Sequence, residues 1–318
     1  MLGGMEDYPR TILEFEGRFA SEAACRAYLV SLRWPDGFRC PGCGGSRAWW
    51  TGRHLLHCAG CGRQSSVTAG TVLQDTRKPL RLWFRAMWYV INQKSGVSAL
   101  GLQRVLGLGS YHTAWAWLHK LRRAMVRPGR ERLAGIVQVD EVYLGGAKAG
   151  KRGRGAAGKH LVVIAAERDG NRIGRIRLRR VPDASATSLH GAIAQAVEPG
   201  SALETDGFQG YCGIATQGYE HEVVRETEDV GAHPLPQCHR VAALLQRWLL
   251  GTHQGAVRGS HLDYYLDEFT FRFNRRTSRS RGKLFYRLAQ QAVAIAPVPE
   301  SQLRAASTDP TAARTDAT

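Results

Sequence analysis

The sequence predicts a multi-domain α/β protein, and three observations along the chain lead to this prediction. Two C-x-x-C pairs lie in a glycine-rich segment between residues 38 and 72. Two short helical stretches separated by glycines come next. Beyond residue 131, strand-like apolar runs alternate with amphipathic helices, which is typical of a sheet covered by helices. The length of 318 residues is sufficient for two or three domains.

The composition predicts a polyanionic partner. Lysine and arginine number 44 against 27 acidic residues, so the formal net charge is +17. Nucleic acid is the first candidate for such a charge and a membrane surface is the second. A bilayer span needs about 18 consecutive apolar residues, and the sequence has no such run, so we expect no membrane partner. The N-terminus lacks the basic and apolar regions of a signal peptide, and we expect a cytoplasmic protein.

Four of the seven cysteines have the spacing of a metal site. Cys40 and Cys43 form one C-x-x-C pair, Cys58 and Cys61 form the other, and 14 residues separate the two pairs. Four thiolates suit tetrahedral Zn²⁺ in a closed structural site. The segment from Ala48 to His57 fits a β-hairpin between the pairs, so we predict a zinc ribbon. A redox or coincidental pair of motifs is the alternative, and His54 or His57 could replace a cysteine ligand.

Helical segments are expected before and after this ribbon. One short amphipathic helix from about Ser21 to Arg33 has Ser21 as a plausible N-cap. Aromatic and apolar residues crowd together over 79–89, which indicates a buried helix. Two helices follow at 98–108 and 111–126, with a glycine-bounded turn at 107–110. The segment 127–132 is a plausible interdomain linker.

The last two helices fit a helix-turn-helix. The second of them could lie in the major groove of DNA, where its N-terminal residues His112 and Thr113 would read bases. Three basic residues near its end would contact phosphates: Lys120, Arg122 and Arg123. The alternative is an ordinary helical hairpin whose charges are merely solvated.

The order of elements after residue 131 predicts an RNase H-like domain. Strands are expected at 136–144, 160–167 and 173–181, at 202–206, and at 221–226. Helices are expected at 184–197, 209–217, 237–250 and 260–275. In an RNase H-like fold the first and fourth strands lie side by side, so Asp140 and Asp206 at their ends would meet. Carboxylates brought together in this way can hold Mg²⁺ or Mn²⁺ for chemistry on phosphodiesters.

The third ligand of that site is the open question. The helix 237–250 follows the fifth strand, where a third ligand is expected, but contains no acidic residue. His239 lies near its start, on the side opposite its apolar stripe, and suits Mn²⁺ better than Mg²⁺. The alternative is that His239 is simply a solvated residue. Glu268 is the rival ligand, although Arg272 at i+4 offers an ordinary salt bridge.

Further basic residues are candidates for phosphate contacts. A glycine-rich basic loop between the first two strands contains Lys151, Arg152, Arg154 and Lys159, and it could follow a DNA backbone as a flexible arm. A solvated hairpin is the alternative for this loop. Arg247, Arg275 and Arg276 are candidates on the closing helices.

Five stretches of sequence then resemble a known family: FRCPGCGG at 38–45, the CAGC pair, VDEVYLGG at 139–146, TDGFQGY at 205–211, and the segment 247–276. They are similar to bacterial insertion-sequence transposases of the ISXO-like group, which join an N-terminal zinc ribbon to a DDE-type catalytic domain. The resemblance covers about residues 8–290. His239 matches the third-ligand position, which is Asn or His in some branches. A lysine common seven residues later in the family is Gln246 here.

The resemblance implies a DNA transposase that binds terminal inverted repeats, cleaves 3′ ends and joins them to target DNA. It also implies structural Zn²⁺, catalytic Mg²⁺ or Mn²⁺, double-stranded DNA as partner, and a homodimer or higher oligomer on DNA. Two alternatives stay open, namely a catalytically inactive transposase-derived DNA-binding protein and an RNase H-like nuclease that cuts without joining. The expected organisation is a helical segment at 1–35, a zinc ribbon at 36–75, a helix-turn-helix region at 76–130, a catalytic domain at 131–292 and a disordered tail at 293–318.

Overall fold

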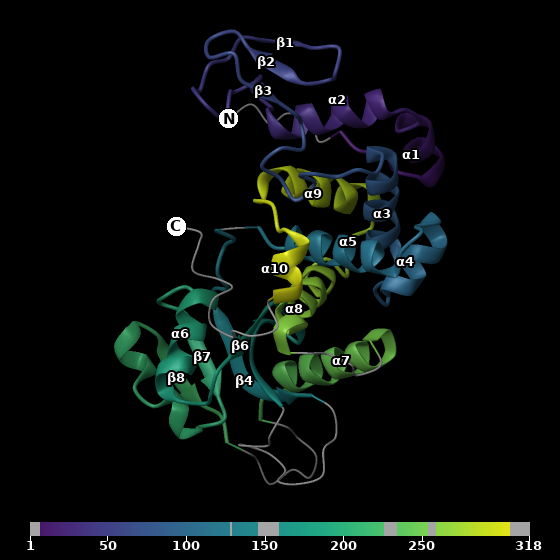
Figure 1. Ribbon diagram of the computed structural model, residues 1–318. Coiled ribbons are helices and arrows are strands. Elements are labelled where there is room, and N and C mark those ends of the chain that lie inside the picture. Colours follow the sequence, from purple (N-terminus) through teal and green to yellow (C-terminus); the bar gives the residue numbers. More distant parts are fainter. Residues whose placement is uncertain (1–6, 128, 146–158, 226–233, 254–258, 306–318) are drawn as a thin grey trace. The chain divides into compact units, whose positions relative to one another are not determined.

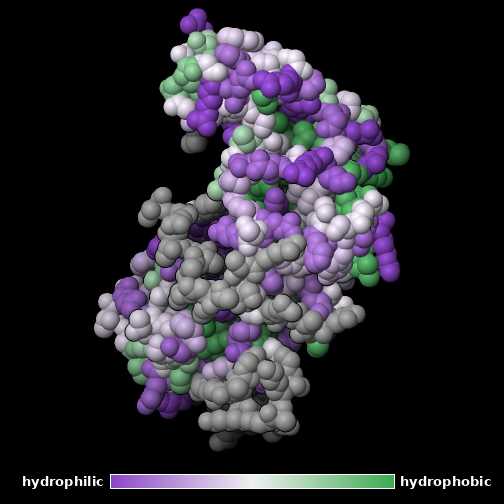
Figure 2. Space-filling model, in the orientation of Figure 1, coloured by the Kyte–Doolittle hydropathy of each residue, from purple (hydrophilic) through white to green (hydrophobic). Residues whose placement is uncertain are grey.

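The computed structural model describes residues 7–127, 129–145, 159–225, 234–253 and 259–305 (Figure 1). The chain forms two compact units. The first comprises Met1–Pro128 with Ser278–Arg304, and the second comprises Gly129–Thr277 with Ala305–Thr318. Among the described residues, no helix is long and apolar enough to cross a membrane. Figure 2 shows hydrophilic side chains over much of the visible face of the first unit, with smaller hydrophobic patches among them.

The first unit combines a small three-stranded sheet with helices. Its sheet has the order β1-β2-β3, with all neighbours antiparallel. Its elements are α1 (Ile12–Arg18), α2 (Glu22–Arg33), β1 (Ala48–Trp50), β2 (Leu56–Cys58), β3 (Gln64–Ser65), α3 (Leu80–Asn92), α4 (Ala99–Leu106), α5 (Tyr111–Arg123), α9 (Arg281–Ala294) and α10 (Glu300–Ala305). The hairpin expected after Ala48 is therefore confirmed.

Local sequence explains where these helices begin and end. The side chains of Ser21 and Ser98 each accept a hydrogen bond from a backbone N–H three residues later, which caps α2 and α4. Helix α4 ends at Gly107, whose φ of 61° is the left-handed conformation that glycine adopts without strain. The prediction of one helix before residue 35 was incomplete, because α1 precedes α2 with its own cap at Thr11.

Helix α9 shows a difference from the expected domain boundary. The sequence analysis placed residues up to 292 in the catalytic domain and foresaw no helix here. Instead, α9 belongs to the first unit and packs against α2 and α3. Phe285 is fully buried and contacts the rings of Phe15, Phe19 and Phe84. The segment beginning at Glu300, expected to be disordered, forms α10 with Leu303 buried.

The second unit is built on a five-stranded sheet of order β6-β5-β4-β7-β8. Strands β4, β5 and β6 are antiparallel neighbours, whereas β4-β7 and β7-β8 are parallel pairs. Its elements are β4 (Ile136–Leu144), β5 (His160–Asp169), β6 (Arg172–Val181), α6 (Ala186–Ala196), β7 (Ala202–Thr205), η1 (Gln209–Tyr211), η2 (Ile214–Gln217), β8 (Glu220–Val223), α7 (Pro236–His253) and α8 (Gly259–Phe273). The mixed topology agrees with the predicted RNase H-like order, in which the first and fourth strands are neighbours.

Each face of this sheet has its own hydrophobic core. Val137, Val139 and Leu203 pack with α6 on one face. Val162 and Ile164 pack with α7 and α8 on the other face, and Figure 1 shows the helices on opposite sides of the sheet. Because side chains alternate along a strand, the residues of β4 with even numbers face α7. The short helix expected at 209–217 is instead two 3₁₀ turns that are separated at Gly213.

Candidate functional site

The four cysteines converge as the sequence predicts. Their Sγ atoms all lie within 4.8 Å of one another. The Sγ–Sγ distance is 3.6 Å both between Cys40 and Cys61 and between Cys43 and Cys58. Four Zn–S bonds of about 2.3 Å in a tetrahedron place sulfurs about 3.8 Å apart, so the cluster fits Zn²⁺. Backbone N–H donors of Gly42 and Cys43 lower the pKa of Cys40, which favours the thiolate that zinc binds.

Asp140 lies within β4, and Asp206 follows directly after β7, the parallel neighbour of β4. Gln138 of β4 and Glu204 of β7 are register partners, and each aspartate follows two residues later. Asp140 is therefore on the α7 face in the middle of β4, whereas Asp206 is the first residue after β7. Asp140 is partly exposed and Asp206 is exposed. The prediction that both aspartates stand at strand ends is therefore wrong for Asp140, although β4 and β7 are neighbours as expected.

Local backbone hydrogen bonds hold the two aspartates. Asp140 accepts a hydrogen bond at Oδ1 from the N–H of Glu141 at 2.8 Å, and Asp206 accepts one at Oδ1 from the N–H of Phe208 at 3.0 Å. After Asp206 the chain turns at Gly207, whose φ is 80°. A Cβ atom there would come within 2.6 Å of Val223, so glycine is required at this turn.

A buried tyrosine provides an electrostatic link between these segments. The Tyr211 hydroxyl donates a 2.6 Å hydrogen bond to Glu141, a residue that sequence reasoning did not single out. Burial raises the pKa of Tyr211, and the nearby charges of Glu141, Asp140 and Asp206 raise it further.

The first turn of α7 lies against the same part of the sheet. Cys238 is completely buried and its Sγ donates to the carbonyl of Ile164 at 3.6 Å. Burial raises the pKa of Cys238, and Asp140 and Glu204 raise it further. His239, the next residue, is exposed, as its position opposite the apolar stripe predicts. Asp140 and the start of α7 are therefore neighbours.

The three expected metal ligands do not close around one point in this structure. Within the described ranges, the cysteine cluster is the one group of three or more metal-binding side chains whose ligand atoms all lie within 4.8 Å. The residues present nevertheless fit a hard divalent cation by type, because Asp140 on β4 and Asp206 directly after β7 supply two carboxylates from adjoining segments. The elements β4, β7 and α7 are thus close together in the fold, but the side chains of the three expected ligands do not meet at one point.

Glu268, the rival third ligand, lies elsewhere in the unit. It is 1% exposed on α8 and accepts hydrogen bonds from Arg272 Nε at 2.9 Å and from an Arg272 terminal nitrogen at 2.7 Å. Helix α8 packs on β6, whereas α7 packs on β4 and β5. The i, i+4 salt bridge that the sequence suggested is therefore present, and α8 covers a different strand from those that bear Asp140 and Asp206.

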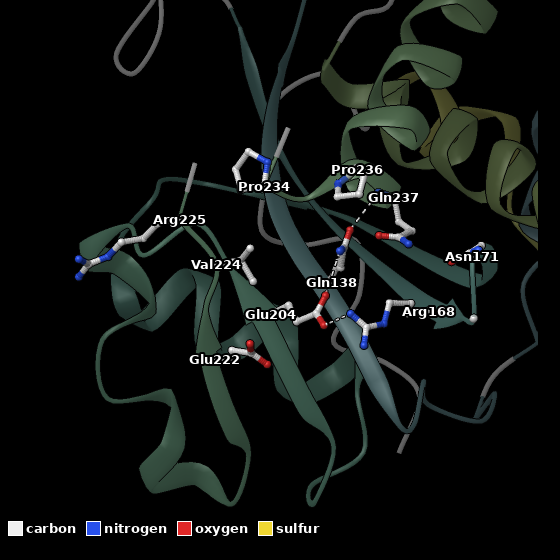
Figure 3. Close-up of a pocket in the computed structure, with 11 residues that line it drawn as sticks. Gln138, Arg168, Asn171, Glu204, Glu222, Val224, Arg225, Pro234, Pro236 and Gln237 are labelled. Atoms are coloured by element: carbon white, nitrogen blue, oxygen red, sulfur yellow. Dashed lines mark hydrogen bonds and ion pairs between the residues drawn. The ribbon is translucent and has the colours of Figure 1, made fainter. Parts of the chain in front are cut away.

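A groove of about 630 Å³, lined mostly by residues with polar side chains, lies on the α7 face beside Gln138 and Glu204. Figure 3 shows Gln138 between Glu204 and the start of α7, with Arg168 beside Glu204. Gln138 donates to Glu204 at 2.9 Å and accepts from the N–H of Gln237 at 2.9 Å, and Arg168 pairs with Glu204 at 2.5 Å. The sequence analysis missed these residues. The sequence did contain a signal for them, because Gln138 and Glu204 are polar residues inside otherwise apolar predicted strands.

The candidate DNA contacts on α5 differ in accessibility. His112 is exposed, Thr113 is partly exposed, and burial lowers the pKa of the half-buried Lys120. The prediction that Arg122 contacts phosphate is wrong for this structure, because Arg122 is 2% exposed and donates to the carbonyl of Val97. Arg123 remains partly exposed.

The other basic candidates also fall into two groups. Arg247 is exposed and Lys159 is partly exposed, whereas Lys151, Arg152 and Arg154 lie outside the described residues. Arg275 and Arg276 stack over Phe271 and Phe273, respectively. Arg276 also donates to backbone carbonyls of Ile173 and Gly174 on β6. The last two arginines therefore have structural contacts within the unit.

Comparisons with known proteins agree with this arrangement of domains. A family model described as an ISXO2-like transposase domain matches residues 132–274, and one described as a transposase zinc-ribbon domain matches residues 20–64. A protein of Halobacterium salinarum, named as an uncharacterized protein in transposable element ISH50, is 28% identical over 290 residues. That alignment covers 83% of this chain and 94% of the relative. The chain therefore contains an ISXO2-like DDE transposase domain with the RNase H-like architecture, preceded by a transposase zinc-ribbon domain.

Proposed function

We propose that this protein binds the ends of an insertion sequence and catalyses metal-dependent cleavage of their 3′ ends and joining to target DNA. The observation that carries the proposal is that Asp140 on β4 and Asp206 directly after β7 lie two residues beyond the register partners Gln138 and Glu204 of these adjoining parallel strands. The match to an ISXO2-like transposase domain and the net charge of +17 support a DNA substrate.

In this proposal Asp140 and Asp206 hold the divalent cations, and His239 completes the coordination from α7. When bound, Mg²⁺ or Mn²⁺ would activate a water molecule or a 3′-hydroxyl and stabilise the leaving oxygen. The register pairing of Gln138 with Glu204 sets the relative positions of the two aspartates, because each lies two residues further along the chain. His239 is an exposed residue near the start of α7.

Helices α4 and α5 are the proposed DNA-reading element. They pack on each other across a turn of four residues, Gly107 to Ser110. Trp83 of α3 stacks on Trp117 at 3.8 Å between ring centroids, which holds α5 from its buried side. We assign base reading to His112 and Thr113, and phosphate contacts to Lys120 and Arg123. Because two ends must be brought together, we also propose a homodimer or higher oligomer on DNA.

A strand-transfer assay tests the proposal. Labelled duplexes carrying the element's terminal inverted repeat are incubated with the full chain, target DNA and either Mg²⁺ or Mn²⁺. Joined products are the expected result. Cleavage without joining would indicate a nuclease, and binding without cleavage would indicate an inactive DNA-binding relative. Either of these outcomes contradicts the proposal.

A further inference from the structure

Gln138 makes side-chain hydrogen bonds to both other elements that carry a proposed metal ligand. It lies on β4, its amide N–H donates to Glu204 of β7 at 2.9 Å, and its amide oxygen accepts from the backbone N–H of Gln237 on α7 at 2.9 Å. The side chain is 3% exposed. One buried amide therefore joins β4, β7 and α7.

The spacing along the three elements is the same. Asp140 lies two residues beyond Gln138, Asp206 lies two residues beyond Glu204, and His239 lies two residues beyond Gln237. On a strand, a step of two residues keeps the side chain on the same face. On α7 the same step advances only about 3 Å and turns the side chain by about 200°, so His239 and Gln237 lie on different sides of the helix. The contacts of Gln138 therefore fix the level of β4 and β7 relative to the first turn of α7, and not the direction of the His239 side chain.

The chemistry of the contacts requires an amide at position 138. The Gln237 N–H needs an acceptor, and the Glu204 carboxylate needs a donor, so the amide can point only one way. Glutamate could accept from Gln237 but would place a second negative charge against Glu204. Arg168 binds the other oxygen of Glu204 at 2.5 Å, which orients this buried carboxylate.

We infer that Gln138 is a positioning residue that holds Asp140, Asp206 and His239 in register for the divalent cation. The inference rests on the proposed function. In this role Gln138 orients the metal ligands without contacting the metal itself. Outer contacts that orient metal ligands typically alter metal affinity or activity by about 10- to 100-fold when removed.

The test uses Mn²⁺ binding by the full chain, measured by electron paramagnetic resonance, together with the strand-transfer rate. Gln138→Met keeps an unbranched side chain of similar size and removes both hydrogen bonds. We expect the half-saturating Mn²⁺ concentration to rise by about 10- to 100-fold, with DNA binding in gel-shift assays unchanged. The control is Glu222→Gln. Glu222 is an exposed residue of the same groove and is the register partner of Glu204.

A charge exchange separates positioning from simple damage to the fold. In the double variant Gln138→Glu with Glu204→Gln, the carboxylate at position 138 can accept a hydrogen bond from the Gln237 N–H. The amide at position 204 can donate to that carboxylate and still accept a hydrogen bond from Arg168. The pair keeps the wild-type charge, so the double variant should recover most of the Mn²⁺ affinity that Gln138→Met loses. Melting temperatures identify the variants that remain folded.

The possible failures are distinguishable. If Asp140→Asn binds Mn²⁺ as tightly as the wild type does, the metal site and the proposed function are wrong. If Asp140→Asn loses binding but Gln138→Met retains wild-type affinity, only the role of Gln138 is overturned. A folded double variant that stays as weak as Gln138→Met also overturns that role.

Discussion

Glu268 and Arg272 form an ion pair one turn apart on α8, with Glu268 1% exposed and the Arg272 side chain 14% exposed. The pair gives this acidic position a structural explanation, because the carboxylate is already engaged by a cation. The two candidates for the third ligand also differ in accessibility, because Glu268 is buried whereas His239 is exposed.

Glu268→Gln and His239→Ala should therefore have opposite effects. Removing one charge of a buried pair leaves the other poorly compensated, so Glu268→Gln should lower the free energy of unfolding by roughly 3 kcal/mol. His239→Ala changes an exposed helical residue and should alter stability by no more than about 0.5 kcal/mol. It should nevertheless abolish strand transfer. Urea unfolding and strand-transfer assays of both variants measure these effects. Full activity in His239→Ala together with a folded, inactive Glu268→Gln would reverse the assignment.

Asp140→Asn and Asp206→Asn should each abolish joining without loss of DNA binding. A metal ion contributes several kcal/mol of transition-state stabilisation, which corresponds to a rate loss of at least about 1000-fold. Asparagine keeps the side-chain shape and can still accept the backbone hydrogen bonds that hold residues 140 and 206. Single-turnover strand transfer and gel-shift assays provide the comparison. Measurable joining by either variant at the wild-type rate would contradict the site.

Zinc removal should unfold the ribbon. Structural zinc in small ribbons supplies on the order of 10 kcal/mol, so the segment between Cys40 and Cys61 should not remain folded without it. Trp49 and Trp50 lie on β1 within this segment, and their fluorescence should change on chelation. We expect one Zn²⁺ per chain by atomic absorption, and loss of that ion in Cys58→Ser. Cys212→Ser, which alters an exposed cysteine outside the cluster, is the matched control and should keep its zinc.

Asn274 should protect the open edge of the large sheet. Its side chain accepts from the Ile176 N–H at 2.8 Å and donates to the Ile176 carbonyl at 3.1 Å, in the manner of a neighbouring strand. β6 is an edge strand of the sheet, and unpaired edges promote aggregation. Asn274→Ala should lower stability by about 1–3 kcal/mol and accelerate hydrogen exchange at Ile176. Asn274→Asp, which retains only the acceptor, should have a smaller effect on that amide. Unchanged exchange in the alanine variant would rule out this role.

Glu167 should make the stability of the second unit pH-dependent. Burial raises the pKa of Glu167, but hydrogen bonds from the Arg175 side chain and from the backbone N–H groups of Arg175 and Ala134 outweigh it, so the pKa is lowered from 4.5. A lowered pKa means that the stabilisation is fully present above pH 4.5 and is lost as the pH falls through the folded-state value. Because the Arg175 side chain is 40% exposed, we expect Glu167→Gln to cost no more than about 1 kcal/mol at pH 7. Melting temperatures of variant and wild type should converge in acid, and a difference that persists there would contradict this explanation.

Most secondary structure could be predicted from the sequence because its signals are local. The predicted strand at 136–144 coincides with β4, and the serine caps and the glycine after α4 mark helix ends as expected. Helix α9 was missed even though Leu284, Phe285 and Leu288 have helical spacing and Ser280 caps it. Its membership in the first unit could not be read from the sequence, because that depends on packing against α2 and α3.

The sequence by itself predicted the cysteine cluster and the neighbouring strands that lead to Asp140 and Asp206. The short C-x-x-C spacing brings the thiols of each pair together, and the predicted strand order makes β4 and β7 neighbours. Only the tertiary structure decided what each remaining polar side chain does. Arg122 is buried against Val97, Glu268 pairs with Arg272, and Gln138 joins three elements. The physical reason is that a polar residue's role depends on its partner and burial, and both are set by contacts between segments distant in the chain.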